Sequence, residues 1–130
     1  MKLLLDTHIW IWTVLEPQRL SRRVAKELDS SKNELWLSPV SIWEAMFLHR
    51  KKKLIVPEGF STWLTRALTV APFSEAPLTF DVAQAFCTIN LPHADPADLF
   101  LVGSAKAFGL TLVTSDRNLI HTKEISIMQN

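Results

Sequence analysis

Four acidic residues stand at places in the sequence from which they could act together on one substrate. The first and the last each end a short apolar run, and the other two lie near the starts of predicted helices. Carboxylates held within a few ångströms repel one another, and a divalent cation relieves the repulsion; all-oxygen ligands favour Mg²⁺ or Mn²⁺. Such an ion polarises a phosphoryl oxygen and activates water for phosphodiester hydrolysis. The candidates are Asp6, Glu44, Asp98 and Asp116.

Each of these acids also has an ordinary structural explanation. Asp6 can be the N-cap of a helix that begins at Thr7, a contribution of about 1 kcal/mol. The segment Ser41–Glu44 matches a capping box, although Ser38-Pro39 is the better helix start. Asp116 can be a plain turn residue. These roles explain each acid singly, but they explain the common placement of the acids less well.

The sequence Asp95-Pro96-Ala97-Asp98 contains two acids that divide the structural and functional roles between them. Asp95 can be an N-cap, Pro96 the first helical residue, and Asp98 the third, where its charge complements the helix dipole. Asp95 is better placed for the cap. Asp98 opens a strongly apolar helix and is expected to point toward the edge of the sheet.

Short apolar runs alternate with helical patterns along the chain, which predicts an α/β fold with a parallel sheet covered by helices. In such sheets ligands bind beyond the carboxyl ends of the strands, near a topological switch point. We therefore expect the acids that follow strands to line that edge. Strands are predicted over Lys2–Leu5, Glu34–Leu37, Leu110–Val113 and Ile125–Met128, and helices over Thr7–Leu15, Ser21–Ser30, Ser38–Lys53, Phe60–Val70, Thr79–Ile89 and Asp95–Gly109.

The composition is that of a single globular domain over residues 1–130. Apolar residues make up 48% and charged residues 21% of the 130 residues, which excludes a disordered chain. The net charge of +1 means that any nucleic-acid contact needs locally gathered positive charge. A single cysteine, Cys87, excludes an internal disulfide framework and suits a reducing cytoplasm. We expect neither a secretion signal nor a membrane span.

Other site chemistries lack their characteristic patterns. The four histidines, His8, His49, His93 and His121, show no zinc-ligand spacing, and no phosphate-binding glycine loop or nucleophile elbow is present. The basic run Arg50–Lys53 is either a solvated helix end or, with help from Arg19, Arg22 and Arg23, a phosphate-contacting patch. Among the tryptophans, Trp36, Trp43 and Trp63 are predicted in the core; Trp10 and Trp12 face different ways, so one of them is expected to be exposed.

Four stretches together resemble the PIN-domain ribonucleases, specifically the small VapC-type toxins of prokaryotic toxin–antitoxin pairs. They are LLLDTHIW, LSPVSIWE, LPHADPADLFLVGSAKAFG and LTLVTSD, which occur in the family's order and span nearly the whole chain. The resemblance implies a three-layer α/β/α sandwich, hydrolysis of RNA, homodimerisation, and inhibition by a cognate antitoxin that inserts near the acidic pocket. It also implies that Asp6, Glu44, Asp98 and Asp116 hold Mg²⁺ or Mn²⁺, with Asp95 beside them and with Thr7, Thr114 and Ser115 orienting the attacking water.

The chain departs from the family pattern at one place. Many relatives read D-P-F-D-R where this chain has Ala97 and Leu99 in place of the bulky residue and the arginine. The departure favours the alternative of a degenerate PIN-like module that binds RNA or a protein partner without cleavage. A phosphoacceptor receiver domain ranks below both, because Asp6 has no adjacent acid and Arg117 follows the late acid where a lysine is needed.

Overall fold

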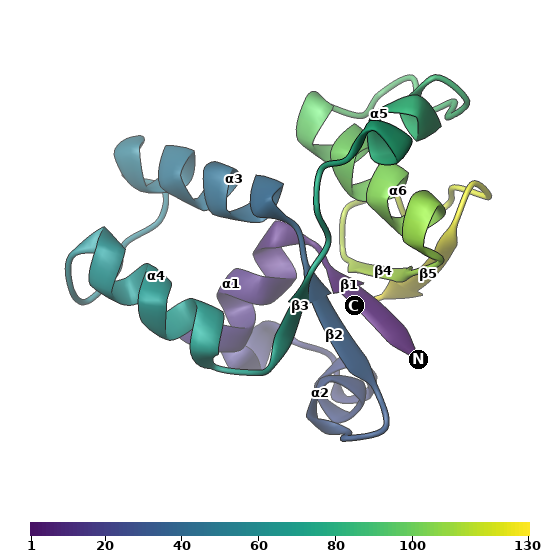
Figure 1. Ribbon diagram of the computed structural model, residues 1–130. Coiled ribbons are helices and arrows are strands. Elements are labelled where there is room, and N and C mark those ends of the chain that lie inside the picture. Colours follow the sequence, from purple (N-terminus) through teal and green to yellow (C-terminus); the bar gives the residue numbers. More distant parts are fainter.

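The computed structural model describes residues 1–130, and its five strands form one parallel sheet in the order β3-β2-β1-β4-β5 (Figure 1). Every neighbouring pair is parallel, so all carboxyl ends meet at one edge. The chain builds outward from β1 on one side and returns to β1 on the other, which places the switch point between β1 and β4. The strands are β1 (Lys2–Leu5), β2 (Glu34–Leu37), β3 (Phe73–Glu75), β4 (Thr111–Thr114) and β5 (Ser126–Gln129).

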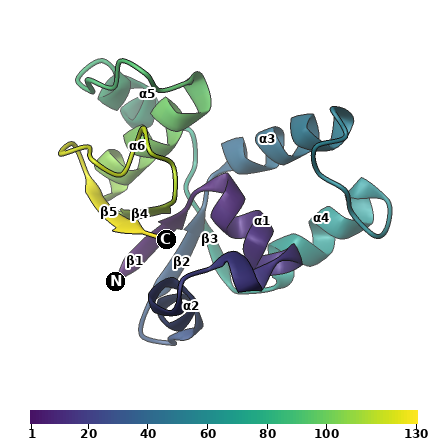
Figure 2. The same ribbon diagram turned by 180° about the vertical axis from the view of Figure 1, so that it is seen from behind.

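Helices cover both faces of this sheet, as the two opposite views show (Figures 1 and 2). Helices α1, α2 and α4 lie on one face, and α5 and α6 lie on the other. Helix α3 runs along the carboxyl edge between them, because Val40 packs in one core and Ala45 in the other. The helices are α1 (Thr7–Leu15), α2 (Arg22–Asp29), α3 (Pro39–Arg50), α4 (Phe60–Thr69), α5 (Phe80–Phe86) and α6 (Pro96–Phe108), with a short 3₁₀ helix over Pro17–Arg19.

The alternation of side chains along β1 divides the interior into two cores. Leu3 and Leu5 belong to the core beneath α1 and α4, whereas Leu4 belongs to the core beneath α6. All three are fully buried, which is why the strand carries three consecutive leucines instead of alternating with polar residues. The predicted parallel sheet and three-layer sandwich are therefore confirmed. No helix is both long enough and apolar enough to cross a membrane.

Strand β3 was not predicted from the sequence, and two helices end earlier than predicted. β3 has three residues, lies at the sheet edge, and stands between Pro72 and Pro77, so it offers almost no pattern to read. The helix predicted to reach Lys53 ends at Arg50, and the one predicted to reach Ile89 ends at Phe86.

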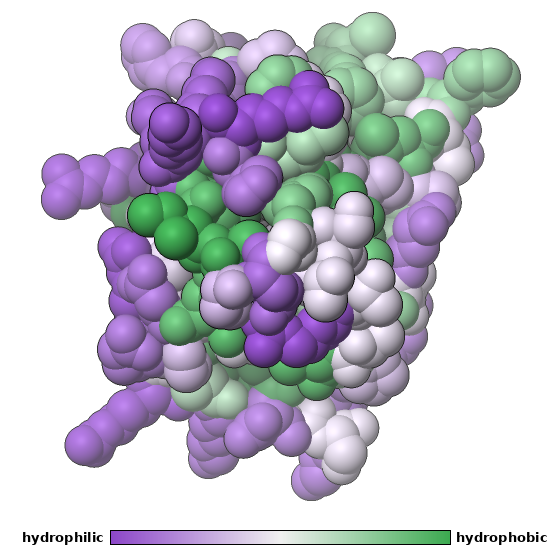
Figure 3. All heavy atoms as spheres, turned by 90° about the vertical axis from the view of Figure 1, so that its left-hand side faces the viewer, coloured by the Kyte–Doolittle hydropathy of each residue, from purple (hydrophilic) through white to green (hydrophobic).

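The chain leaves α3 through a turn at Lys52, which has a left-handed φ of 59°. The backbone N–H of Lys53 donates to the carbonyl of Leu48, which closes the helix end in place of the usual glycine turn. The side of the molecule where α3 leads into α4 faces the viewer in Figure 3, and strongly hydrophilic side chains lie there directly beside hydrophobic ones.

The expectations about tryptophan burial are met only in part. Trp63 is fully buried as predicted, and Trp36 is half-buried against the core. Neither Trp10, which is buried, nor Trp12, which is half-buried, is the exposed residue that was expected. Trp43, predicted in the core, has 49% of its surface exposed. Helix α3 is apolar on several sides, so its periodicity does not select one inward face, and the face that packs inward carries Val40, Ser41 and Ala45 instead.

Candidate active site

The switch point of the sheet places two of the candidate acids next to each other. Asp6 follows β1 and Asp116 lies two residues beyond β4, and these two strands are neighbours. The backbone N–H of Asp6 continues the pairing by donating to the carbonyl of Val113 at 3.0 Å. The parallel arrangement thus brings together two residues far apart in the sequence.

Asp6 caps helix α1 and also lines the cavity, so its interpretation as an N-cap is compatible with its interpretation as a site carboxylate. One carboxylate oxygen, Oδ1, accepts from the N–H of Thr7 at 2.7 Å and caps α1. The other, Oδ2, accepts from the hydroxyl of Thr114 at 2.6 Å. With 8% of its surface exposed, Asp6 is held in one orientation at the base of the cavity.

The hydroxyl of Thr114 also connects Asp6 to Asp116. Its oxygen accepts from the backbone N–H of Asp116 at 3.0 Å while its proton goes to Asp6. The carboxylate of Asp116 accepts from the N–H of Asn118 at 2.8 Å, which is the turn role expected of it. Asp116 therefore keeps a fixed backbone position and one carboxylate oxygen free of this turn.

Glu44 is connected to α1 by a hydrogen bond from the hydroxyl of Thr7, which also contacts the hydroxyl of Ser41. The hydroxyl of Thr7 donates to Oε1 of Glu44 at 2.5 Å and lies 2.9 Å from Oγ of Ser41. Helix α3 is capped by Ser38, whose side chain accepts from Val40, so Glu44 is not part of a capping box. Its carboxylate is left to face the cavity.

Asp95 and Asp98 form a reciprocal capping box at the start of α6. Oδ1 of Asp95 accepts from the N–H of Asp98 at 2.9 Å, and Oδ2 of Asp98 accepts from the N–H of Asp95 at 3.4 Å. Asp95 is the N-cap, as expected, and Asp98 is the more buried of the two, with 9% of its surface exposed. The box fixes Asp98 beside the other acids.

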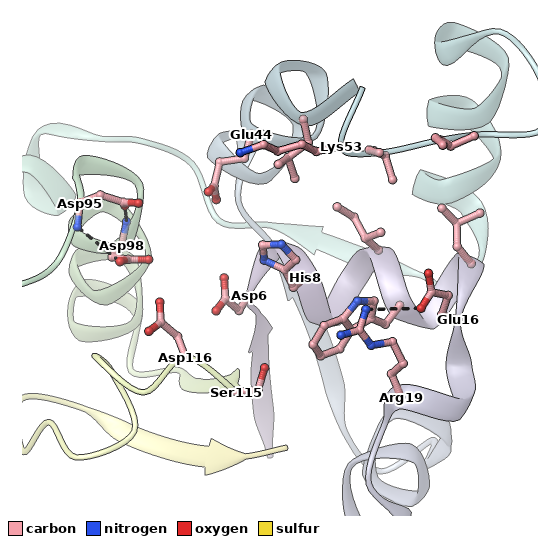
Figure 4. A pocket seen from close by; sticks show the side chains of 16 residues that line it. Asp6, His8, Glu16, Arg19, Glu44, Lys53, Asp95, Asp98, Ser115 and Asp116 are labelled. Atoms are coloured by element: carbon pink, nitrogen blue, oxygen red, sulfur yellow. Dashed lines mark hydrogen bonds and ion pairs between the residues drawn. The ribbon is translucent and has the colours of Figure 1, made fainter. Parts of the chain in front are cut away.

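These acids meet at one end of a cavity of about 730 Å³ (Figure 4). Asp6, Asp116, Asp95 and Asp98 lie on one side of the view, with Glu44 above Asp6 and His8 next to it. Lys53 lies beside Glu44, whereas Arg19 lies at the opposite end of the cavity. Apolar side chains also line it. The cavity is lined by Asp6, His8, Ile11, Trp12, Leu15, Glu16, Arg19, Glu44, Leu48, Lys53, Leu54, Ile55, Asp95, Asp98, Ser115 and Asp116.

Burial and mutual repulsion raise the pKa of three of these carboxyls. For Asp6, loss of solvation raises the pKa and outweighs the hydrogen bonds from Thr114 and Thr7. Loss of solvation raises the pKa of Glu44, and nearby carboxylates raise it further. The pKa of Asp98 rises to about 7, chiefly through loss of solvation and then through repulsion by Asp95, Asp116 and Asp6.

The donor chemistry of the cluster suits a hard divalent cation, although the side chains do not form a ready-made cage. No three Asp, Glu, His or Cys side chains are placed to hold a metal ion jointly. Mg²⁺ usually keeps several waters and takes only one or two protein carboxylates, so it needs no such cage. Oxygen-only donors that repel one another fit this ion, and Asp6, Glu44, Asp98 and Asp116 are the residues that can hold it.

Two residues at the site, Ser41 and His8, were not predicted there from the sequence. Ser41 contacts Thr7, and it lies one helical turn before Glu44, a spacing that puts both on one face of α3. His8 lines the acidic end, but its neighbour Asp6 was the only indication of this. Arg19 and Lys53, named in the sequence as part of a possible phosphate-contacting patch, both line the cavity, whereas Arg22 and Arg23 do not.

Comparison with known proteins identifies the family and the fold. The model of the family described as PIN domain matches residues 3–125. Ribonuclease VapC22 of Mycobacterium tuberculosis is 29% identical over 125 residues, which cover 89% of this chain and 88% of that protein. The fold is similar to two crystal structures: VapBC2 from Rickettsia felis bound to a DNA fragment from their promoter (TM-score 0.74, 14% identity, 99% of this chain and 98% of that chain), and VapBC-5 from Mycobacterium tuberculosis (TM-score 0.64, 15% identity, 99% and 98%).

Proposed function

Because the chain belongs to the PIN domain family, we propose that it is a divalent-metal-dependent ribonuclease and the toxin of a toxin–antitoxin pair. The observation that carries the proposal is the cluster of carboxylates whose pKa values are raised at one end of a cavity. The similarity of the chain to a protein named Ribonuclease VapC22 supports RNA as the substrate.

In this proposal Asp6, Glu44, Asp98 and Asp116 hold Mg²⁺ or Mn²⁺. When bound, the ion supplies positive charge beside the scissile phosphate and makes water a better nucleophile near neutral pH. The carboxylates cannot all be ionised cheaply without it, because they repel one another in a partly desolvated site. Metal binding and the ionised state of the cluster are therefore linked.

The neighbouring hydroxyls and the second aspartate position these ligands. Thr114 orients Asp6, and Thr7 orients Glu44, through the hydrogen bonds described above. Asp95 holds Asp98 through the capping box. Ser115 lines the cavity, and in this proposal its hydroxyl orients the attacking water. Groups of this kind fix the direction of metal ligands and strengthen binding.

We propose a cognate antitoxin as the protein partner, homodimerisation, and a cytoplasmic location. The structural relatives are VapBC complexes, which supports an antitoxin. The cavity supports insertion of an antitoxin segment near the acids, since a cationic side chain there would neutralise carboxylates much as a metal ion does. Asp6 and Asp116 lie at that end.

A cleavage assay on a panel of structured RNAs tests the ribonuclease proposal. Antitoxin-free protein is incubated with Mg²⁺, with Mn²⁺ or with EDTA, beside Asp6→Asn, Asp116→Asn and the control Asp81→Asn, an exposed acid on α5. We expect cleavage only with metal, its loss in the first two variants, and wild-type activity in the control. Calorimetric titration with Mn²⁺ is run in parallel.

Each outcome assigns a role to the acids. Wild-type cleavage by Asp6→Asn or Asp116→Asn would remove that residue from the ligand set. No binding of Mn²⁺ at millimolar concentration, together with no cleavage, would favour a degenerate module that binds without cutting. Metal binding without cleavage of any RNA in the panel would point to a substrate narrower than the panel.

A further inference from the structure

A second groove, of about 330 Å³, lies between α3 and the first residues of α6, and the proposed chemistry does not use it. Trp43 and Phe47 form its wall on α3, and Pro96 and Ala97 form its wall on α6. Two lysines, Lys51 and Lys53, also line it. Because the side chain of Ala97 is small, it occupies little of the groove on the side opposite the aromatic residues.

The two aromatic side chains are exposed, whereas Val40, Ile42 and Leu48 of α3 pack against the cores. Trp43 has 49% and Phe47 has 37% of its surface exposed. They stand one helical turn apart, and their ring centroids lie 4.7 Å from each other at an interplanar angle of 74°. This edge-to-face contact holds the indole in a defined orientation and leaves surface of both rings open to a ligand.

The turn at Lys52 brings positive charge to these rings. Its left-handed φ of 59° reverses the chain, so that Lys53 lies where the groove meets the acidic cavity. Lys51 and Lys53 form no ion pair with any acid of the protein. Both ammonium groups are thus available to an anion, and the two carboxylates that also line the groove, Glu44 and Asp95, lie on the side shared with the acidic cavity.

The groove continues into the acidic cavity. Four residues line both hollows: Glu44, Leu48, Lys53 and Asp95. A polymer whose backbone is bound at the acids can therefore continue from the cavity into the groove along α3. Single-stranded nucleic acid has the matching chemistry, since its bases stack on aromatic rings and its phosphates bind lysine.

From this juxtaposition we infer that Trp43 and Phe47, with Lys51 and Lys53, form a binding platform for single-stranded RNA that flanks the scissile phosphate. At least one base stacks on Trp43, and the lysines contact the adjoining phosphates. The inference rests on the proposed ribonuclease function and adds the residues that hold the substrate beside the acids. A second copy of the chain is the other occupant that could bury the apolar rings, and sedimentation distinguishes it from RNA.

The test compares Trp43→Leu, which keeps apolar bulk but removes the ring, with Trp43→Phe, which keeps a ring. Phe80→Ala is the matched control, because Phe80 is 89% exposed and lines neither hollow. All variants are made in an Asp116→Asn background. Binding of a fluorescent single-stranded RNA decamer of mixed sequence, and of its abasic counterpart, is measured by anisotropy at fixed salt.

We expect Trp43→Leu to weaken binding of the decamer about 5- to 100-fold, the range for loss of one stacked base, with little change in Trp43→Phe or Phe80→Ala. The abasic decamer should bind weakly to all variants, and Trp43→Leu should not weaken it further. Circular dichroism and urea unfolding check that each variant is folded.

Three results would overturn the inference. These are equal decamer affinity in the parent and Trp43→Leu, no measurable decamer binding by the parent, and an unchanged affinity accompanied by a shift in oligomeric state on sedimentation. The last would assign the rings to an interface between copies. Metal-dependent cleavage by the wild-type protein is measured separately. If Trp43 proves not to bind RNA, cleavage can still establish the ribonuclease function; if no cleavage occurs, the decamer affinities still test the binding platform.

Discussion

Replacing Asp98 by asparagine should stabilise the metal-free protein, and should do so more at pH 8 than at pH 5. Loss of solvation and repulsion by Asp95, Asp116 and Asp6 raise the pKa of Asp98 from 3.8 to about 7. An acid with a higher pKa in the folded state binds more protons folded than unfolded. The free energy of unfolding of the wild-type protein therefore falls as the pH rises from about 4 to about 7. Above that range the ionised carboxyl destabilises the folded state by its full amount.

The size of the effect follows from the pKa difference. About three pKa units correspond to about 4 kcal/mol between the two limits, and about 2.5 kcal/mol of this falls between pH 5 and pH 8. Asp98 faces a cavity that water enters, which screens part of the repulsion, so we expect about 1–2.5 kcal/mol. Asparagine keeps an oxygen that can accept the N–H of Asp95, so the capping box survives.

Urea unfolding in EDTA at the two pH values, followed by tryptophan fluorescence, measures this difference. At each pH the change in the free energy of unfolding caused by the substitution is determined. Subtracting the change at pH 5 from the change at pH 8 cancels any effect of the substitution that does not depend on pH. Asp81→Asn, on the exposed surface of α5, should show no such pH-dependent gain. Equal gains for Asp98→Asn at both pH values would show that the carboxyl is not destabilising when ionised, and would refute the repulsion argument.

Three further substitutions test the packing and the site. Gly103→Ala should lower the free energy of unfolding by about 1–3 kcal/mol, because a Cβ there would lie 2.6 Å from an aromatic carbon on α5; Gly59→Ala, which meets nothing within 4 Å, is the control, and equal stabilities would contradict the close approach. Ser38→Ala should cost about 1 kcal/mol in the same urea assay through loss of the α3 cap. Thr114→Val should weaken Mn²⁺ binding about 10- to 100-fold by calorimetry, since it removes the hydroxyl that orients Asp6; unchanged affinity would count against that role.

The sequence was sufficient for the parallel sheet, except for its edge strand β3, and for the placement of the acids at its carboxyl edge. The apolar run Leu3–Leu5 needs burial on both faces, and parallel strands end at one edge, so acids that follow strands must gather there. The resemblance to the PIN-domain family is confirmed by the match over residues 3–125. The assignment of Asp6 and its partners as metal ligands stays a prediction.

Other features depend on contacts that no local pattern records. Strand β3 exists because β2 offers it a partner, and its three residues have no periodicity of their own. The exposure of Trp43 depends on which side of α3 meets the sheet edge, a choice that an all-round apolar helix leaves open. The position of Lys53 depends on a left-handed turn made by lysine instead of glycine.

The pairing of β1 with β4 determines when the acidic cavity can first exist. The hydroxyl that orients Asp6 belongs to Thr114, 108 positions later in the sequence. Chains are synthesised at about 5–20 residues per second, so about 5–20 s separate the appearance of the two residues. During that time the first strand has no partner on this side, and Glu44 has no carboxylates from the later segment beside it. Any ligand that recognises the assembled cluster can therefore bind only a chain whose synthesis has passed residue 116, and contacts of such long range are also slow to form.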